Sequence, residues 1–242
     1  MGIVNVTPDS FSDGGQFFKP EEAIRRAKNL IADGADIIDL GGESTRPGAT
    51  PISWEEEWTR IEPVLEGLKA SIRSVGSISV DTYHPETAAK AIKAGANIIN
   101  CVYAEPIPEM LKLLEGNDVE LVMPYRLGDE DFRRETRDAR LASRLYLDPM
   151  IGFGTTREED IELLKSIPEL AKKGRVLIGA SRKRIVKKLV GEKSAVGKNI
   201  GGNVAIAVWA AMQGASVVRV HDVKETVQAL RVVESLKFRV ES

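Results

Sequence analysis

The chain has 242 residues, of which 43% are hydrophobic and 29% charged, and its formal net charge is −2. This size suits one α/β barrel, and the near balance of charge argues against a nucleic-acid partner. A single cysteine, Cys101, excludes an intrachain disulfide and fits a reducing compartment. Neither a secretory signal nor a bilayer-length apolar run is found, so we expect a cytoplasmic protein without membrane contact.

Eight short β-branched runs recur along the chain and predict eight strands. Most are continuously apolar rather than alternating, which is typical of parallel strands buried on both faces. In chain order, the predicted strands are 2–7, 36–42, 77–82, 97–102, 120–125, 145–150, 175–180 and 216–220.

Helical patterns follow these runs. The segment 20–35 begins with Pro20, carries acidic residues in its first turn and has Gly34 near its end, which are helix start and stop signals. The segment 129–144 is highly charged and has only a thin apolar stripe. The predicted helices are 20–35, 85–95, 108–116, 129–144, 156–173, 201–214 and 223–236.

The alternation of strands and helices predicts the fold class. Eight such repeats favour one α/β domain over residues 1–242, a single (β/α)8 TIM barrel. An open doubly wound sheet is the alternative. Such a sheet usually has fewer strands, and a GxGxxG motif follows its first strand. This chain has no such motif after its first predicted strand.

Polar residues gather where the predicted strands end, and in a parallel barrel all these ends lie on one rim. Each Asp or Asn alone is more often a helix cap or a turn residue. Caps do not account for Lys183, Arg219 and His221. Arg219 and His221 are two residues apart and point to one face, which favours an anion site. The strand-end residues include Asn5, Asp39, Asp81, Asn100, Asp148, Lys183, Arg219 and His221.

Two loops rich in small and polar residues, 8–15 and 41–48, follow the first two strands. Such loops close over a substrate and exclude water in many enzymes. Solvated turns are the alternative, although an aromatic residue such as Phe11 usually packs on something. Cys101 has no histidine near it in sequence, so we expect a small buried residue rather than a nucleophile.

Long motifs in the chain resemble one family. MGIVNVTPDSFSDGG at 1–15 and GADIIDLGGESTRPG at 34–48 are similar to the two signature segments of the dihydropteroate synthases. The likeness continues in the same order through SVDTYHPETAAKAIKAGANIIN at 79–100, LDPMIGFG at 147–154, GASRKR at 179–184 and VRVHDV at 218–223. The resemblance implies a pterin-binding (β/α)8 fold. It also implies condensation of 6-hydroxymethyl-7,8-dihydropterin pyrophosphate with p-aminobenzoate to 7,8-dihydropteroate and pyrophosphate, in folate biosynthesis.

The resemblance also implies a pterin site. Asp148 would accept two parallel hydrogen bonds from the 2-amino and N3 edge of the pterin. Lys183 would donate to the pterin carbonyl, and Met123 would pack on the ring. The pterin-binding residues implied in this way are Asp81, Asn100, Met123, Asp148 and Lys183.

A pyrophosphate site with a metal ion is implied as well. Mg²⁺ would bridge pyrophosphate oxygens near Asn5, and the metal and cations would stabilise the charge of the leaving group. The residues implied for pyrophosphate are Asn5, Thr45, Arg219 and His221. In a dissociative displacement Asp13 would face the developing cation and Arg46 would help close the site. The implied catalytic residues are therefore Asp13, Arg46 and Lys183.

The p-aminobenzoate pocket implied by the family would be walled by Phe11, Pro47, Phe153 and the stem of Lys183. The family usually forms homodimers through its later helices. The apolar segment 204–212, with Trp209, is the candidate surface, and packing of that segment against the barrel is its alternative reading.

The chain departs from the family pattern after three predicted strands, and its charge-rich segment 125–144 is short for the family. Asn100 is followed by Cys101 rather than Asp, Met123 by Pro124 rather than His, and Pro149 by Met150 rather than Gly. Two other hypotheses stay open: a pterin-dependent methyltransferase-like protein, and a pterin-binding barrel that does not catalyse. The two loops count against the first, because those relatives lack them. A modified arylamine in place of p-aminobenzoate also stays open.

Overall fold

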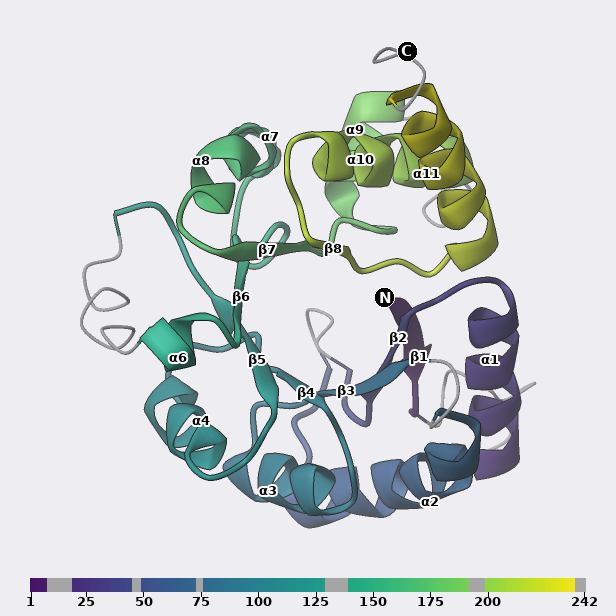
Figure 1. Ribbon diagram of the computed structural model, residues 1–242, viewed down its shortest axis with the longest axis vertical. Coiled ribbons are helices and arrows are strands. Elements are labelled where there is room, and N and C mark those ends of the chain that lie inside the picture. The colour runs from purple at the N-terminus through teal and green to yellow at the C-terminus, as the bar shows by residue number, and fades with distance from the viewer. Residues whose placement is uncertain (8–18, 45–48, 73–75, 129–138, 192–198, 238–242) are drawn as a thin grey trace. The chain divides into compact units, whose positions relative to one another are not determined.

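The computed structural model describes residues 1–7, 19–44, 49–72, 76–128, 139–191 and 199–237. These residues belong to two compact units, Gly2–Met123 and Pro124–Ser242, with Met1 in the second. Both units are α/β structures whose strands run parallel (Figure 1).

The first unit contains a parallel sheet in which strands pair in their chain order. This sequential order is what successive strand–helix repeats give, whereas a doubly wound sheet reverses its order at one point. The apolar strands are buried on both faces, as their continuous hydrophobic runs predict. The strands are β1 Gly2–Asn5, β2 Ile37–Gly41, β3 Ser77–Asp81, β4 Ile98–Asn100 and β5 Glu120–Pro124.

Four helices lie along this sheet in chain order (Figure 1). They are α1 Pro20–Ala32, α2 Trp54–Ile72, α3 Pro85–Lys93 and α4 Ile107–Leu114. The sequence patterns predict α1, α3 and α4 but not α2. Pro63 lies inside α2, and an internal proline is usually a sign that a helix ends.

The second unit contains β6 Leu145–Asp148, β7 Arg175–Ile178 and β8 Val217–Val218, paired in that order. Its core gathers aliphatic residues such as Leu147, Ile151 and Ile178. The amino group of Met1 donates to the Val218 carbonyl at 3.0 Å, and the Val220 N–H donates to Met1 at 2.9 Å. The first residue of the chain is thus hydrogen-bonded beside β8.

The helices of the second unit are α6 Ala139–Ala142, α7 Arg157–Lys165, α8 Ile167–Ala171, α9 Arg184–Val190, α10 Ile200–Met212 and α11 Val223–Lys237. Figure 1 shows α9, α10 and α11 side by side. Within the described ranges, no helix combines the length and apolar character needed to cross a membrane.

All eight predicted strands are present, and each is shorter than predicted. The polar residues Asn5, Asp81, Asn100 and Asp148 are the last residues of their strands. The single predicted helix 156–173 is wrong, since α7 ends at Lys165 and α8 starts after Ser166. Pro168, which has no N–H to donate, lies in the first turn of α8 and accounts for the break. Of the predicted helix 129–144, residues 129–138 lie outside the described residues and α6 covers part of the remainder.

The capping box at the start of α7 gives a stability prediction. The Thr156 side chain accepts from the Glu159 N–H at 3.2 Å, and the Glu159 carboxylate accepts from the Thr156 N–H at 2.7 Å. Thr156→Ala should lower the free energy of unfolding by about 1 kcal/mol, because a helix N–H loses its acceptor. Urea denaturation measures the change.

Thr59→Ala is the matched control. The Thr59 hydroxyl donates to the Glu55 carbonyl within α2 and is exposed, so it caps nothing. Its removal should change the free energy of unfolding by less than about 0.5 kcal/mol. Equal losses in the two variants would contradict a specific capping contribution.

Candidate active site

The register of the first unit brings Asn5, Asp81 and Asn100 to one level of the sheet. Asn5 pairs with Gly41, Gly41 with Asp81, and Asp81 with Asn100. Paired residues of a parallel sheet point to the same face, and neighbouring strands lie about 4.8 Å apart. The three side chains therefore stand in a row at the carboxyl ends of β1, β3 and β4. Gly41 has no side chain to fill the space beside Asp81, where a Cβ would lie 3.7 Å from the Asp81 Cβ.

Asp39 lies below this row, two residues before Gly41 on β2, and its side chain is fully buried. The Asn100 Nδ2 donates to the Asp39 Oδ2 at 3.4 Å. The buried Asn100 Oδ1 has no hydrogen-bond partner among the described residues. Asp39 thus orients the Asn100 amide. Sequence reasoning noted Asp39 only as a strand-end residue, although an aspartate inside an apolar run was the available signal.

Met123 and Cys101 are both buried. Met123 follows Val122, the β5 residue paired with Asn100. The Cys101 Sγ donates to the Tyr103 carbonyl at 3.3 Å. Burial raises the pKa of the Cys101 thiol to about 12, so this group is a neutral thiol at physiological pH. That agrees with a small buried residue rather than a nucleophile.

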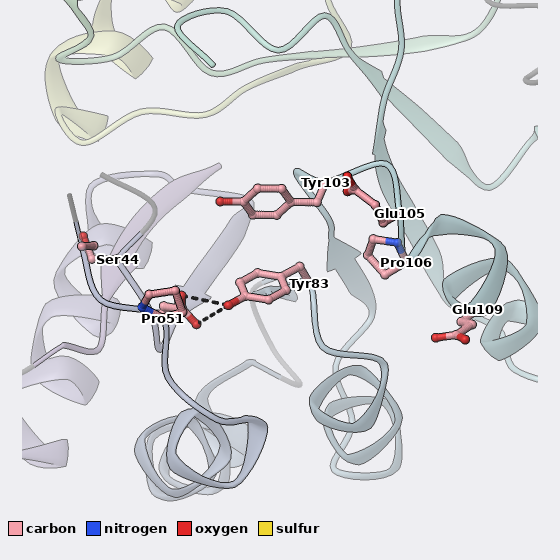
Figure 2. Close-up of a pocket in the computed structure, with 9 residues that line it drawn as sticks. Ser44, Pro51, Tyr83, Tyr103, Glu105, Pro106 and Glu109 are labelled. Carbon is pink, nitrogen blue, oxygen red and sulfur yellow. Dashed lines mark hydrogen bonds between the residues drawn. The ribbon is translucent and has the colours of Figure 1, made fainter. Parts of the chain in front are cut away.

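Loops after β2, β3 and β4 line a cavity of about 590 Å³ (Figure 2). The Tyr83 hydroxyl lies 3.0 Å from both oxygens of Glu43 and donates to this carboxylate, and the Tyr83 and Tyr103 rings meet edge to face at 5.0 Å. Burial and the Glu43 carboxylate raise the pKa of Tyr83 to about 12. Glu105 and Glu109 add two more carboxyl groups to the lining. This acidic surface does not suit an anion such as pyrophosphate or a benzoate.

Asp148 ends β6 in the second unit and is buried. Its Oδ1 accepts from the Met150 N–H at 2.7 Å. Burial raises the pKa of Asp148, while the charges of Lys183 and Arg219 and the bond from Met150 act in the opposite direction. Met150 has a φ of 65°, a left-handed conformation that favours glycine. The turn therefore retains the backbone shape expected of Asp-Pro-Gly although the residue is methionine.

Lys183 lies across the turn that follows β6. Its Nζ donates to the Ile151 carbonyl at 2.6 Å and lies 4.3 Å from the centre of the Phe153 ring. Gly152 has a φ of 78°, and a Cβ there would lie 3.0 Å from the Lys183 Cδ, so glycine suits this position on both counts. Lys183 and Phe153, predicted for the same subsite, are thus in contact in the structure.

Asp160 holds this turn from α7. Its Oδ1 accepts from the Gly152 N–H at 2.7 Å and from the Thr155 hydroxyl at 2.6 Å. Sequence reasoning took Asp160 only as one of several acidic residues in the first turn of a helix. Nothing in the local pattern distinguishes it from Glu158 and Glu159, which face solvent.

Arg219 and His221 follow β8. The Arg219 Cδ and the Lys183 Nζ each lie 3.9 Å from where a Cβ of Gly179 would be, so this glycine at the end of β7 lies between the two cations. Ser181 accepts from the His221 backbone N–H at 3.2 Å and lies 3.1 Å from its Nδ1. A hydroxyl that donates to Nδ1 leaves the proton of a neutral ring on Nε2, which is then a donor for an anion.

A partly buried network fixes the loops that carry Lys183 and His221. Arg182 pairs with Asp222 at 2.5 Å, and the Asn203 Nδ2 donates to the same carboxylate at 3.2 Å. The Asn203 Oδ1 accepts from the Arg182 N–H at 2.9 Å. Because Asn203 belongs to α10, the network ties the loops after β7 and β8 to one helix. Ser181 and Asn203 are supporting residues that sequence reasoning missed.

The described site residues thus form two groups, one in each unit. The first unit holds Asn5, Asp81, Asn100 and Met123, and the second holds Asp148, Phe153, Lys183, Arg219 and His221. The remaining predicted residues lie outside the described residues: Phe11, Asp13, Thr45, Arg46 and Pro47. In the part of the chain that the structure describes, no group of three or more His, Cys, Asp or Glu residues could hold a metal ion.

The family described as pterin binding enzyme matches residues 1–138 and 131–221. The dihydropteroate synthase of Streptococcus pyogenes serotype M6 is 37% identical over 253 residues, covering 98% of this chain and 94% of the relative. That of Escherichia coli strain K12 is 40% identical over 258 residues, covering 97% and 90%.

Solved structures agree with these relatives. The Xanthomonas albilineans dihydropteroate synthase with 4-aminobenzoic acid has a TM-score of 0.87 and 39% identity, covering 98% of this chain and 92% of that one. The Burkholderia cenocepacia dihydropteroate synthase complexed with 7,8-dihydropteroate has a TM-score of 0.83 and 30% identity, covering 99% and 91%. All four are synthases, which does not favour the methyltransferase hypothesis. The chain belongs to the dihydropteroate synthases, pterin-binding transferases of folate biosynthesis.

Proposed function

We propose that this chain carries out the synthase reaction with the two groups of residues described above. 6-Hydroxymethyl-7,8-dihydropterin pyrophosphate and p-aminobenzoate react to give 7,8-dihydropteroate and pyrophosphate. The observation that carries the proposal is a buried Asp148 acted on by the charges of Lys183 and Arg219, in segments that match synthases. Solved relatives hold 4-aminobenzoic acid and 7,8-dihydropteroate, the second substrate and the product of this reaction.

The pterin end of the substrate calls for acceptors in a buried setting. Asp148 accepts two parallel hydrogen bonds from the 2-amino and N3 edge, and such charge-assisted pairs are strong. Lys183 donates to the pterin carbonyl. The Asn100 Oδ1 has no hydrogen-bond partner among the described residues. It is suited to accept from the ligand, because a buried amide oxygen without a donor costs free energy. Asp81 and Met123 complete this subsite.

The pyrophosphate end calls for donors and cations. Arg219 and His221 bind it, with Asn5 and Thr45, and the His221 ring is oriented for this by Ser181. These groups stabilise negative charge that grows on the leaving group as the carbon–oxygen bond breaks.

Asn5 also suits the Mg²⁺ that the family implies. Its side chain offers a hard oxygen donor at the end of β1, and Mg²⁺ is commonly held by few protein ligands together with phosphate oxygens and water. When bound, Mg²⁺ supplies Lewis-acid neutralisation of the pyrophosphate oxygens.

The displacement proceeds without a covalent enzyme intermediate. The electron pair of the breaking bond leaves with pyrophosphate, and Asp13 faces the cation that develops on the pterin. The amino nitrogen of p-aminobenzoate then forms the new bond and loses a proton. Phe11, Pro47, Phe153 and the Lys183 stem wall the p-aminobenzoate pocket, while Arg46 helps to close the site against water.

Residues 1–242 form a single (β/α)8 barrel domain in this proposal. The sequential strand order in each unit supports it, as do the hydrogen bonds of Met1 beside β8. The single buried thiol of Cys101 suits a reducing compartment, in keeping with a cytoplasmic location.

The enzyme works as a homodimer in this proposal. Trp209 and Met212 on α10 and Val232 and Leu236 on α11 are large apolar residues that are exposed. Exposed apolar groups of this size are typical of an interface, and a second copy of the chain is the occupant that the family resemblance implies.

The first test is release of pyrophosphate by the purified protein. Release should require both p-aminobenzoate and Mg²⁺, because Mg²⁺ neutralises the charge of the leaving group and because the pterin cation recombines with pyrophosphate unless the amine captures it. A coupled phosphate assay with each component omitted in turn measures this. A folded protein that binds the pterin without turnover would instead support the non-catalytic barrel.

Lys183→Ala should reduce kcat/KM by at least about 100-fold, since a charge-assisted hydrogen bond and one wall of the amine pocket are lost together. Lys188→Ala is the matched control, because Lys188 lies on α9, the helix that Lys183 precedes, and forms an ion pair with exposed Glu158. Steady-state kinetics at saturating Mg²⁺ compare the two. An intact rate in Lys183→Ala would contradict the pterin assignment.

Trp209→Glu combined with Met212→Glu should convert the dimer to a monomer, because two charges would be buried at the apolar surface. Analytical ultracentrifugation at micromolar concentration measures the mass. A wild-type protein that is already monomeric, or a double variant that stays dimeric, would rule out this surface.

A further inference from the structure

Glu57 is a buried carboxyl that the proposed reaction does not use. It lies near the start of α2 beside two other glutamates, Glu55 and Glu56, which face solvent. Only 1% of Glu57 is exposed. Removing a carboxyl from water costs free energy, and such groups are rarely kept inside a protein without a partner or a function.

The partner of Glu57 is the residue directly after Asp81. The Thr82 hydroxyl donates to the Glu57 Oε2 at 2.6 Å, and both groups are buried. The Thr82 backbone N–H donates to the Asn100 carbonyl at 3.0 Å, and its hydroxyl accepts from the His84 N–H at 3.1 Å. Through Thr82, the carboxyl of Glu57 is connected to the ends of both β3 and β4, from which Asp81 and Asn100 project.

Glu57 also packs directly under the loop that follows β2. A Cβ on Gly42 would come within 2.9 Å of the Glu57 Cγ, so the loop backbone rests on the glutamate side chain. One turn along α2, the Arg60 Nη1 donates to the Gly42 carbonyl at 2.8 Å. The first turns of α2 therefore hold the backbone of Gly42, directly after β2.

The electrostatic setting of Glu57 is unfavourable to its charged form. Burial raises its pKa from the ordinary 4.5 to about 7, and the nearby carboxylates of Asp81 and Glu43 add to this rise. The hydrogen bond from Thr82 opposes it.

The other oxygen of this carboxyl is not satisfied by a clear hydrogen bond. The Thr87 hydroxyl is near enough to oppose the rise in the Glu57 pKa, yet the hydrogen bond it makes goes to the Trp54 carbonyl at 3.4 Å. The Glu57 Oε1 has no hydrogen-bond partner among the described residues, so its placement is costly for the fold alone.

We propose that Glu57 is a positioning residue of the pterin site, which acts through Thr82 to fix the direction of Asp81 at the end of β3 and which supports Gly42 directly after β2. The inference rests on the proposed function, in which Asp81 contacts the pterin. It explains why a carboxyl, rather than an aliphatic side chain, is buried beneath the two strand ends.

Three variants test the contact. Glu57→Ala removes the carboxyl, Thr82→Val removes the hydroxyl at equal volume, and Glu57→Gln retains an acceptor for Thr82. Glu57→Ala and Thr82→Val should each raise the KM for the pterin pyrophosphate about 10-fold, the loss expected for one buried hydrogen bond of about 1.4 kcal/mol. Glu57→Gln should stay within about 3-fold of wild type, since its amide oxygen accepts from Thr82.

The double variant Glu57→Ala with Thr82→Val should be no worse than either single variant, because both remove the same contact. Glu55→Gln is the control, as it removes one negative charge from an exposed site of the same helix. Full additivity in the double variant, or a KM change in Glu55→Gln equal to that in Glu57→Ala, would overturn the proposal.

A second readout follows from the charge of Glu57 and does not depend on turnover. Because its pKa of about 7 in the folded protein lies above the unfolded value near 4.5, folding binds a proton between these values. The contribution of protonated Glu57 to the free energy of unfolding is therefore fully present below pH 4.5, and it is lost as the pH rises from 4.5 through 7. Glu57→Gln should gain stability over wild type across this window and level off above it. A pH-independent difference would mean that Glu57 does not titrate there.

The possible outcomes distinguish a failure of the proposed function from a failure of the positioning role of Glu57. A wild-type protein that neither binds the pterin pyrophosphate by calorimetry nor releases pyrophosphate contradicts the proposed function. A wild-type protein that does both, with folded Glu57→Ala and Thr82→Val variants of unchanged KM and kcat, contradicts the positioning role. If Glu57→Ala does not fold, a folded Thr82→Val variant of unchanged KM and kcat contradicts the positioning role by itself.

Discussion

Keeping a carboxylate buried at the end of a strand is the constraint on which the rest of the site depends. Asp148 is buried, and burial alone favours its neutral form. A neutral acid is a poorer acceptor for the pterin edge than a carboxylate is. Lys183, Arg219 and the Met150 N–H each act to restore the charged form. The two cations that oppose the cost of burial are the same side chains assigned to the pterin carbonyl and the pyrophosphate.

This arrangement requires support from residues far from the chemistry. Lys183 can lie over the turn after β6 because Gly152 has no side chain and because Asp160 accepts a hydrogen bond from the Gly152 N–H. His221 is oriented by Ser181. In the proposed function neither supporting group contacts a substrate, yet each fixes the direction of a side chain that does. A positioned donor costs less to use than a mobile one.

The sequence predicts the strands and the residues at their ends well, because both follow from local patterns. Eight apolar runs predict eight parallel strands, and polar residues such as Asn5, Asp81 and Asn100 fall at one level of a sheet once the register is known. The sequence predicts α2 and the break at Ser166 less well. Pro63 lies inside one continuous helix, whereas Pro168 lies in the first turn of a new helix, and the residues around them do not distinguish the two cases. Supporting residues such as Asp160 and Asn203 are set by contacts across long separations, which no local pattern carries.

Glu57 is another residue whose role the local sequence pattern does not predict. Ser53 accepts from the Glu56 N–H at 3.3 Å at the start of α2, and three acidic residues in the first turn match a helix N-terminus, where negative charge is favourable. The pattern therefore accounts for all three glutamates without any special role. Only the fold separates them, because the helix turns the third toward Thr82 and the backbone of Gly42. The helix N-terminus reduces the cost of a charge that burial opposes, which makes this a tolerable place for a carboxyl beneath the site.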